Sequence, residues 1–534
     1  MIDLADLKSK PSRRSYRSAL APALAFWIAS GAAAATLTVT NLADAGPGSL
    51  RQAVLDANAA AGPDDVAFAP GVAGTITLTS GEIAISDPLT VNGPGLGVLT
   101  VSGNEQFRIF YVENPSASAP IDVTLSGLTL TRGQGFPGHP DDVGGAVWSD
   151  GENLTITDSV ISDGKSGILG PGPGCGGNVA LYGGAGGGGV TLRIANSRVT
   201  GGRAVGTGSE AGGNLCIVGA RLLLEESTLS GGIAASGGGL SLLSSASDNS
   251  IVLSDLSGNS GASLGGGLYT NLSFGGVLTI ESSTISLNTS GLFGAGGGLF
   301  IAGGGEIRML DTTVWGNNAK VGGGIFSQNN DLQLVNSTVS GNSANTSAAG
   351  IFFSESGAGS LLLRLTTVSD NRAAGLGGGL VVSISAANIV QLDHSILANG
   401  FPDDLAGSAL PATVTANYTL IETPGTSVLV GAHNLTGIDP RLGPLADNGG
   451  PTLTHKPLSG SPVIDAGDPA IPSPPATDQR GFARIVGPAV DLGSVEAGLD
   501  LVEVPTLSQV GLVVLFALVF VAGVLRMRRG GMTG

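Results

Sequence analysis

Short apolar runs that alternate with polar or small residues dominate the middle of the chain. Runs such as Val277–Ile280 and Leu332–Leu334 place an apolar side chain at every second position. This period of two predicts β-strands that turn one face toward an interior. No apolar repeat of helical period interrupts these runs between residues 96 and 400. The pattern therefore indicates an all-β structure built from many short strands.

The strands belong to a repeated unit with two anchors. The first anchor is Ser/Thr-x-Val/Ile/Leu-x-x-Asn/Gly, and the second is Gly-Gly or Ala-Gly followed by an apolar residue. Successive copies lie roughly 25–30 residues apart, which is the length of one unit in a solenoid. The apolar residues of the first anchor are Ile161, Val199, Leu229, Leu256, Ile285, Val314, Val339, Val368 and Ile396, and those of the second are Val147, Leu240, Leu268, Leu299, Ile325, Ile351 and Leu380.

The repeat length selects one architecture. β-Propellers need repeats of roughly 40 residues or more, and leucine-rich and helical repeats need a helical segment in each unit. We therefore expect a right-handed, single-stranded parallel β-helix with about three short strands per coil. Asparagines recur at one corner of the unit, where stacked side-chain amides can hydrogen-bond along the axis. They are Asn259, Asn288, Asn317, Asn342, Asn371 and Asn399.

Composition agrees with a rod and excludes one class of partner. The chain has 89 glycines, 42% hydrophobic residues and only 12% charged residues. It is too apolar for a disordered chain and too rich in glycine for an ordinary α/β domain. The formal net charge of −17 comes without a basic stripe that could meet phosphates, so nucleic acid is not an expected partner.

The N-terminal region reads as an export signal followed by a cap. Residues 1–35 combine a basic start, an apolar stretch and an Ala-x-Ala site, so cleavage is expected before Thr36. Residues 36–95 contain a predicted amphipathic helix with Ser49 as its N-cap and Leu50, Ala53, Val54 and Ala57 on one face. A repeat array must cover its first open coil, so we expect this helix to close the rod.

Three segments carry resemblances to bacterial exported proteins. Residues 48–95, with Ser-Leu-Arg-x-Ala-Val-x-x-Ala-Asn, resemble the N-terminal module of exported β-helix proteins, whose common fold is pectin lyase-like. Residues 401–499 follow the rod at 96–400 and resemble the choice-of-anchor Q module of bacterial surface proteins, through the motifs at 439–454, 457–468, 478–482 and 490–496. The repeats are similar to those of chlamydial polymorphic outer membrane adhesins, although the C-terminal β-barrel of that family is missing.

The tail at 500–534 resembles C-terminal sorting signals of the Ile-Pro-Thr-Leu type, with Val504 in place of isoleucine. Its residues are Pro505, Thr506, Leu507, Ser508 and Gly511, then a hydrophobic stretch, then Arg526, Arg528 and Arg529. The resemblance implies a sorting protease or transpeptidase as a partner and a C-terminal helix that is in the membrane at least transiently. The positive-inside rule places the arginines in the cytoplasm and the rod outside it, so the rod is expected at the cell surface, at the outer membrane or in the extracellular space. The alternative is a simple tail anchor.

Candidate catalytic residues are few. Adjacent carboxylates, which glycoside hydrolysis would need, occur beside prolines at Asp141-Asp142 and Asp403-Asp404, where turn chemistry accounts for them. The histidines lack metal-site spacing. We therefore predict no catalytic residues, no metal site and no cofactor.

Cys175 and Cys216 are the only cysteines. Alignment of Gly176-Gly-Asn178 with Gly212-Gly-Asn214 places Cys216 beside Ala180, five positions from Cys175. This offset exceeds the reach of a disulfide unless a turn folds back. We therefore expect no disulfide.

Aromatic residues favour a binding function. Trp148, Tyr269, Phe300, Phe326 and Phe352 each follow a Gly-Gly-apolar or Ala-Gly-apolar anchor, and a period of two would point them outward. Four of them would stack as an exposed stripe, which is typical of an interaction surface, unless loops cover it. The sequence thus favours a surface-displayed adhesin or structural protein that binds a glycan or a partner cell surface. The alternative is a polysaccharide lyase or glycoside hydrolase, since fold alone does not decide function.

Overall fold

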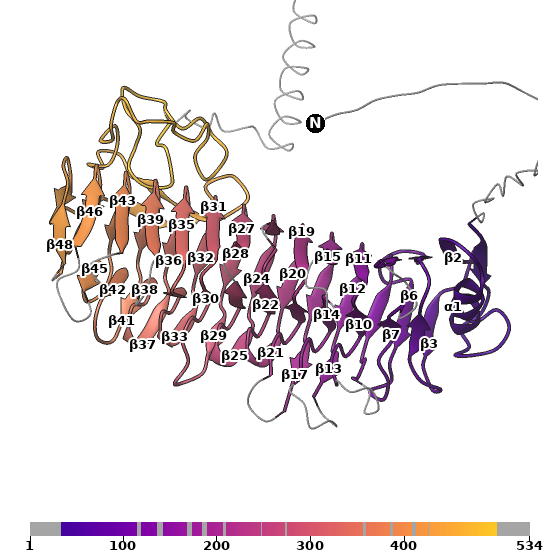
Figure 1. The fold of residues 1–534 in the computed structure, drawn as a ribbon. Helices are drawn as coiled ribbons and strands as arrows, with labels where there is room; N and C mark the ends of the chain where they lie inside the picture. Colours follow the sequence, from indigo (N-terminus) through magenta and orange to yellow (C-terminus); the bar gives the residue numbers. More distant parts are fainter. Residues whose placement is uncertain are drawn as a thin grey trace, which may run out of the picture.

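The computed structural model describes residues 34–498, apart from the segments 115–118, 136–141, 168–173, 184–188, 207–209, 247, 273–274, 356–358, 385–387, 408–412 and 426. Over these residues the chain winds into an elongated, right-handed parallel β-helix (Figure 1). The predicted fold class is confirmed. One coil consists of β34 (Ile325–Gln328), β35 (Asp331–Val335), β36 (Thr338–Ser340) and β37 (Ser343–Ser347), after which β38 (Ile351–Glu355) pairs with β34.

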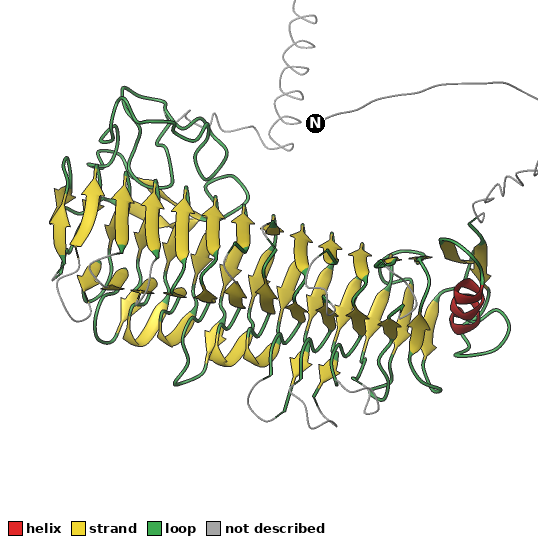
Figure 2. Ribbon diagram, in the orientation of Figure 1, coloured by secondary structure: helices red, strands yellow, loops and turns green. Residues whose placement is uncertain are grey.

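Strands at equivalent positions of successive coils pair in parallel and form long sheets (Figure 2). A 15-stranded sheet runs from β1 (Thr36–Val39) to β48 (Val428–Val430), a 14-stranded sheet from β3 (Gly74–Thr77) to β49 (Leu435–Thr436), and a 12-stranded sheet from β4 (Ile83–Ile85) to β45 (Leu405–Gly407).

A fourth sheet was not expected from the sequence. It has eight strands, from β13 (Lys165–Ser166) to β41 (Arg372–Ala373). These strands are two to five residues long, and the side chains that they bury are small, as at Ala344 and Ala373. Segments this short and this weakly apolar carry no alternation that a sequence pattern could detect.

The core is a column of aliphatic side chains that stack from coil to coil. Val314 of β32 (Thr313–Trp315) pairs with Val339 of β36, and Val339 pairs with Val368 of β40 (Thr367–Ser369). All three are fully buried. Burying one such side chain contributes roughly 1.5–3 kcal/mol, and each coil adds several. The apolar residues of both predicted anchors are buried in this way, except Ile396. Ile396 pairs with the outward Thr367 and packs against Val463 and Leu492, and Leu397 takes the core position beside Val368.

The first coils are closed by α1 (Leu50–Ala59), as predicted (Figure 2). Ser49 is its N-cap, and the Ser49 Oγ accepts a hydrogen bond from the Gln52 N–H at 3.1 Å, which satisfies a donor that the first helical turn leaves free. Leu50, Ala53, Val54 and Ala57 are buried and pack into the core of the rod.

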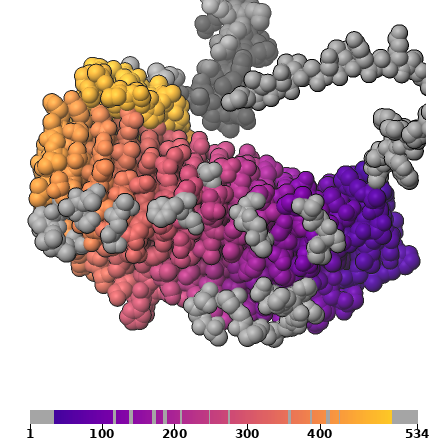
Figure 3. All heavy atoms as spheres, viewed as in Figure 1, coloured from indigo at the N-terminus to yellow at the C-terminus, as the bar shows by residue number. Residues whose placement is uncertain are grey.

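The last part of the chain folds back along the rod. Parallel coils continue through β46 (Thr413–Asn417) to β49. Residues 438–498, here called the C-terminal module, then form loops and one antiparallel pair, β50 (Leu442–Ala446) with β51 (Thr454–Pro457). The module lies over the C-terminal half of the rod, as the raised yellow region of Figure 3 shows.

Two predicted segments fall almost wholly outside the described residues. They are the export signal at 1–35, of which only the last two residues are described, and the sorting signal at 500–534. Among the residues that are described, no helix is both long enough and apolar enough to cross a membrane.

The asparagine ladder runs through the interior of the rod. Each side-chain oxygen accepts two hydrogen bonds from the preceding asparagine, so Asn342 Oδ1 accepts from the backbone N–H of Asn317 at 2.9 Å and from its Nδ2 at 3.0 Å. Asn259, Asn288 and Asn371 repeat this contact. A Cβ on Gly324, at the second anchor, would lie only 3.0 Å from Asn342 Nδ2. The ladder therefore explains one of the repeated glycines.

The ladder differs from the prediction at both ends. Asn178 and Asn214 extend the ladder toward the N-terminus. These two asparagines occupy a different place in the repeat, because each directly precedes the apolar residue of the second anchor. Asn399 does not continue it. This residue has a left-handed backbone, with φ of 55°, and its Nδ2 donates to Ser369 Oγ.

Cys175 and Cys216 form a disulfide, so the prediction of unpaired cysteines is wrong. The predicted alignment holds, because Ala180 pairs with Cys216 and Cys175 pairs with Ala211. The chain reverses at Gly212, which has φ of +64°, and this turn brings Cys216 back beside the position of Ala211. The two Cα atoms are consequently 5.5 Å apart, within disulfide reach.

Candidate functional site

The predicted aromatic residues share one position on the 12-stranded sheet. Tyr269, Phe300, Phe326 and Phe352 lie on consecutive coils and pair directly across β26 (Leu268–Leu272), β30 (Leu299–Gly303), β34 and β38. Their ring centroids are 5.8, 4.9 and 5.0 Å apart. The predicted stack of four rings therefore exists in the fold.

The orientation of these rings limits what they offer to a ligand. The planes of Phe300 and Phe326 are inclined by only 6°, and those of Phe326 and Phe352 by 26°. The ring faces thus meet one another along the rod, whereas sugar rings prefer free aromatic faces. Phe300 is 7% exposed and the other three are partly exposed. Packing between coils therefore accounts for this stack.

Trp148 belongs to a separate cluster. It is only 2% exposed and packs against Tyr111, with ring centroids 4.7 Å apart. The buried guanidinium of Arg108 lies 4.8 Å from the Trp148 ring and donates to the carbonyl of Val143. Three coils with Ala180, Cys216 and Ser241 at the same register separate Trp148 from Tyr269.

The acidic pairs lie at opposite ends of the rod. Asp142 precedes β10 (Val147–Asp150), the third strand of the 12-stranded sheet, and Asp404 precedes β45, the twelfth. Nine coil spacings of ~4.8 Å separate them by roughly 43 Å. Asp404 is fully buried, and its carboxylate accepts hydrogen bonds from the backbone N–H groups of Gly400 and Thr423. Burial raises the pKa of Asp404 to about 6. Asp141 lies outside the described residues.

The outward face of the 14-stranded sheet carries rows of small polar side chains. In each three-residue strand the central residue points into the core and the two flanking residues point outward. In β20 (Thr228–Ser230) and β24 (Asp255–Ser257), the central leucines are fully buried and the flanking residues are partly exposed. From β9 (Thr129–Thr131) to β28 (Thr284–Ser286) the flanking residues are Thr129, Thr131, Val160, Ser162, Arg198, Thr200, Thr228, Ser230, Asp255, Ser257, Thr284 and Ser286.

Two shallow depressions of about 200 and 280 Å³ lie along the edge of this face. Both are lined by Glu226 and Thr228, so they form one groove. Asp255 and Thr284 line the first depression, which Pro451 of the C-terminal module bounds. Arg198 lines the second. We call this surface the hydroxyl groove.

The C-terminal module covers the continuation of the same face. Thr313 Oγ1 donates to the carbonyl of Leu453 at 2.6 Å. Gln479 joins two coils, because its Nε2 donates to Thr313 Oγ1 at 2.8 Å and its Oε1 accepts from Thr338 Oγ1 at 2.6 Å. Ser494 contacts Thr338 on one coil and Thr367 on the next. The outward threonines thus hold the module beyond the hydroxyl groove.

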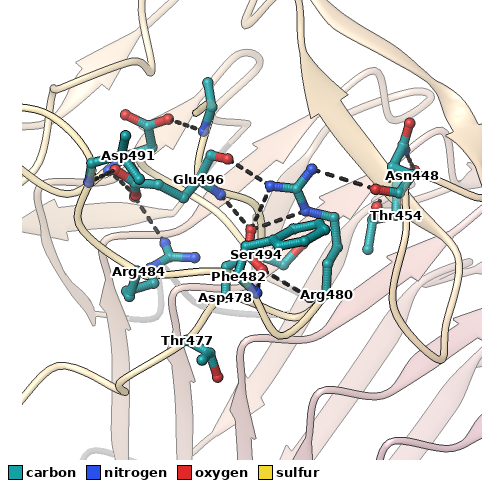
Figure 4. Close-up of polar contacts among 12 residues, drawn as sticks. Asn448, Thr454, Thr477, Asp478, Arg480, Phe482, Arg484, Asp491, Ser494 and Glu496 are labelled. Carbon is teal, nitrogen blue, oxygen red and sulfur yellow. Dashed lines mark hydrogen bonds and ion pairs between the residues drawn. The ribbon is translucent and has the colours of Figure 1, made fainter. Parts of the chain in front are cut away.

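The motifs at 478–482 and 490–496, together with Arg484, form a polar network within the C-terminal module (Figure 4). Asp478 accepts two hydrogen bonds from the guanidinium of Arg480 and one from the backbone N–H of Glu496. Arg484 is almost fully buried and donates to the carbonyls of Asp491 and Gly493. Burial lowers the pKa of Arg484 to about 10. These side chains tie loops together, which is a structural role.

Two histidines also form hydrogen bonds between the rod and the C-terminal module. His394 Nε2 accepts a hydrogen bond from the Asp468 N–H at 3.0 Å. His455 Nε2 lies 2.8 Å from Ser340 Oγ, and its Nδ1 lies 2.7 Å from the carbonyl oxygen of Gly443. In the part of the chain that the structure describes, no group of three or more His, Cys, Asp or Glu side chains could hold a metal ion.

Sequence reasoning missed the hydroxyl groove, although a signal for it was present. The first anchor often has a hydroxyl residue on each side of its apolar centre, as in Thr228-Leu229-Ser230 and Thr338-Val339-Ser340. On a short strand whose central residue is buried, these hydroxyls must face outward. The position of the module, which closes one end of the groove, had no signal of this kind.

Comparisons with known proteins find solved structures with a similar fold but no matching protein family. No family model and no curated protein matches the chain. One similar solved structure is a mannuronic acid specific polysaccharide family 6 lyase enzyme from human gut microbiota, 11% identical, with a TM-score of 0.35 over 72% of this chain and 86% of the lyase. Another is pectate lyase Pel9A, 13% identical, with a TM-score of 0.32 over 88% of this chain and 98% of the lyase. Likeness at this level concerns the β-helix architecture alone.

Proposed function

We propose that this protein is an exported, surface-displayed rod that binds an extended glycan along the hydroxyl groove without cleaving it. The observation that carries the proposal is the repetition of outward hydroxyl groups from β9 to β28, at least one in each of the six coils and a pair in three of them, beside a groove that Pro451 lines. A polymer of repeating units can hydrogen-bond to successive coils of a repeating surface. Each such hydrogen bond contributes about 0.5–1.5 kcal/mol, so several together give useful affinity.

The geometry of individual hydroxyls supports this use. Thr131 Oγ1 and Ser162 Oγ are 2.9 Å apart, and Ser230 Oγ donates to Thr200 Oγ1 at 3.3 Å. These links between coils hold the hydroxyls in register. Every hydroxyl has one donor and two acceptor sites, so a hydroxyl that donates along the row still offers lone pairs to a ligand.

Cleavage of the glycan in the same groove is the second candidate. It is favoured by one observation, which is that Glu226 lines the groove together with Asp255 on one side and Arg198 on the other. Carboxylates and a cation in one groove are the groups that acid–base cleavage would use.

The test incubates the full-length protein with a panel of neutral, amino-sugar and acidic polysaccharides. Retention on the protein and the length of the chains are followed in the same samples. We expect retention without shortening. Thr228→Val should weaken retention, and Thr279→Val, on the 15-stranded sheet, is the matched control. Shortened chains would favour cleavage, and a panel that is neither retained nor shortened would contradict the proposal.

The same proposal includes attachment at the cell surface through the C-terminal tail. It rests on the resemblance of Pro505-Thr506-Leu507-Ser508 to a sorting signal, with a sorting protease or transpeptidase as the partner. The mature C-terminus, measured by mass spectrometry in producing cells, should lie near Pro505, and Pro505→Ala should leave the tail attached. A mature protein that retains Arg528 would instead indicate a simple tail anchor.

A further inference from the structure

Among the described residues, the half of the hydroxyl groove beside Pro451 is lined by carboxylates and by no cation. Its lining contains Glu226 and Asp255 together with serine and threonine hydroxyls and Pro451. The cation of the groove, Arg198, lines only the other depression. A ligand that reaches the wall formed by Pro451 therefore meets two acidic side chains and a set of hydroxyls.

The two acidic side chains differ in their surroundings, since a neighbouring hydroxyl holds Asp255 whereas Glu226 is exposed at a corner. Asp255 Oδ2 accepts a hydrogen bond from Ser257 Oγ at 2.7 Å, and Leu256, between them, is fully buried in the core. Glu226 has a left-handed backbone at the corner that leads into β20, with φ of 46°. Neither carboxylate has an ion pair to a basic side chain among the described residues. Their charge is therefore not neutralised by a basic side chain of the described residues.

Charged residues on the neighbouring strands do not reverse the negative charge of this half of the groove. Glu225 is paired with Arg193 at the 15-stranded sheet, which leaves that pair neutral. Glu281, at the end of β27 (Val277–Glu281), is exposed and adds a further negative charge on the same side of the corner. Like charges repel one another at a protein surface, so a negatively charged ligand is disfavoured here.

We propose that the hydroxyl groove selects amino-sugar glycans, accepts neutral glycans more weakly, and rejects glycans built of uronic acids. This inference rests on the proposed function, since it specifies the ligand of the same groove. Carboxylates accept strong charge-assisted hydrogen bonds from ammonium groups and ordinary ones from sugar hydroxyls. A uronate would instead bring its carboxylate against Glu226 and Asp255, and such like-charge contacts suppress wrong partners.

The test uses the full-length protein and three oligosaccharides of equal length: glucosamine, N-acetylglucosamine and galacturonate oligomers. We expect affinity to decrease in that order. Asp255→Asn and Glu226→Gln should each weaken binding of the glucosamine oligomer about 2–5-fold, as expected for exposed ion pairs, and should reduce its preference over the N-acetylated form. Asp331→Asn, at an exposed acid on β35, is the control and should change neither value.

The outcomes separate this inference from the proposed function. Binding of the galacturonate oligomer as tight as that of the glucosamine oligomer would overturn the selectivity and leave glycan binding standing. An unchanged preference in both Asp255→Asn and Glu226→Gln would also overturn it. Failure of all three oligosaccharides to bind would contradict the proposed function itself.

Discussion

Asn317 donates two hydrogen bonds to the same atom of Asn342, the side-chain oxygen, at 2.9 Å from its backbone N–H and at 3.0 Å from its Nδ2. Both residues are fully buried. Asn259, Asn288 and Asn342 make the same two contacts to the next asparagine, so the corners of these consecutive coils are fixed to one another. Removing one asparagine leaves buried donors unpaired, and an unpaired buried donor costs more than the bond itself contributes.

Replacement of Asn342 by alanine should therefore destabilise the rod. Two donors of Asn317 lose their acceptor, and we expect the free energy of unfolding to fall by about 2–4 kcal/mol. Denaturant titration followed by circular dichroism measures the loss. Asn345→Ala, at an exposed position on the neighbouring strand, should change little. Equal stabilities of the two variants would contradict a structural role for the ladder.

The disulfide gives a second prediction. Cys175 and Cys216 close a loop across 41 residues, and a loop of this size should contribute about 4 kcal/mol by restricting the unfolded chain. Cys216→Ala should lower the stability of the oxidised protein, and Cys175→Ala should lower it by the same amount. Alkylation of the unfolded, non-reduced protein should find no free thiol. Two alkylated cysteines would show that the bond is absent.

The contact between the C-terminal module and the rod predicts that replacing Gln479 has a local effect. Its amide bridges Thr313 and Thr338 and also donates to Thr452 Oγ1 at 2.9 Å. In Gln479→Ala these buried hydroxyls lose a shared partner, so amide hydrogen exchange should become faster in residues 438–498 and stay unchanged in the first coils. Gln391→Ala, which replaces a partly exposed glutamine on β43 (Ile389–Asp393), is the control. Unchanged exchange in the module would argue against this anchoring.

Asp311 should make stability depend on pH. Burial raises its pKa to about 6, above the value of about 3.9 expected in the unfolded chain. The native state therefore binds the proton more tightly, and the contribution of this group to stability, complete below pH 4, is lost as the pH rises through 6. Asp311→Asn removes the charge, and asparagine tolerates the left-handed backbone of this position, with φ of 51°.

The measurement for Asp311 is the melting temperature between pH 4 and pH 8. The wild type should lose stability over this interval relative to Asp311→Asn, and the difference should grow as the pH rises. Asp331→Asn replaces an exposed acid and should follow the wild type. A variant whose melting temperature runs parallel to that of the wild type would show that Asp311 does not titrate in this range.

Structural features that recur along the chain or follow a local rule could be predicted from the sequence, whereas single contacts between distant segments could not. Alternation, the two anchors and the Ser49 cap each recur or follow a local rule, so the β-helix, its buried column and α1 were accessible. The disulfide could not be predicted because it depends on how the turn at Gly212 folds. The fourth sheet could not be predicted because its strands bury little more than alanine side chains. The hydroxyl groove was visible only as polar residues beside buried ones. Its wall at Pro451 arises from contacts across more than a hundred residues, for which local patterns carry no information.

The four stacked aromatic rings lie where the sequence predicts, but their stacking has a different consequence from the one expected. Tyr269, Phe300, Phe326 and Phe352 do align, as the spacing predicts. Because their faces meet, they offer packing between coils more than a platform for sugars. Whether the rings bind a ligand stays a prediction, and it can be separated from the groove by mutation.

The central claim is that a glycan binds along the hydroxyl groove, and one comparison of variants tests it most directly. Retention of a glucosamine polymer is measured for Thr228→Val combined with Thr284→Val, both in the groove lining, and for Phe326→Ala. We expect the groove variant to lose most of its retention while keeping its stability. Phe326→Ala should keep its retention but lose about 2 kcal/mol of stability, because a stacked ring is removed. Loss of retention in Phe326→Ala, with full retention in the groove variant, would contradict the account.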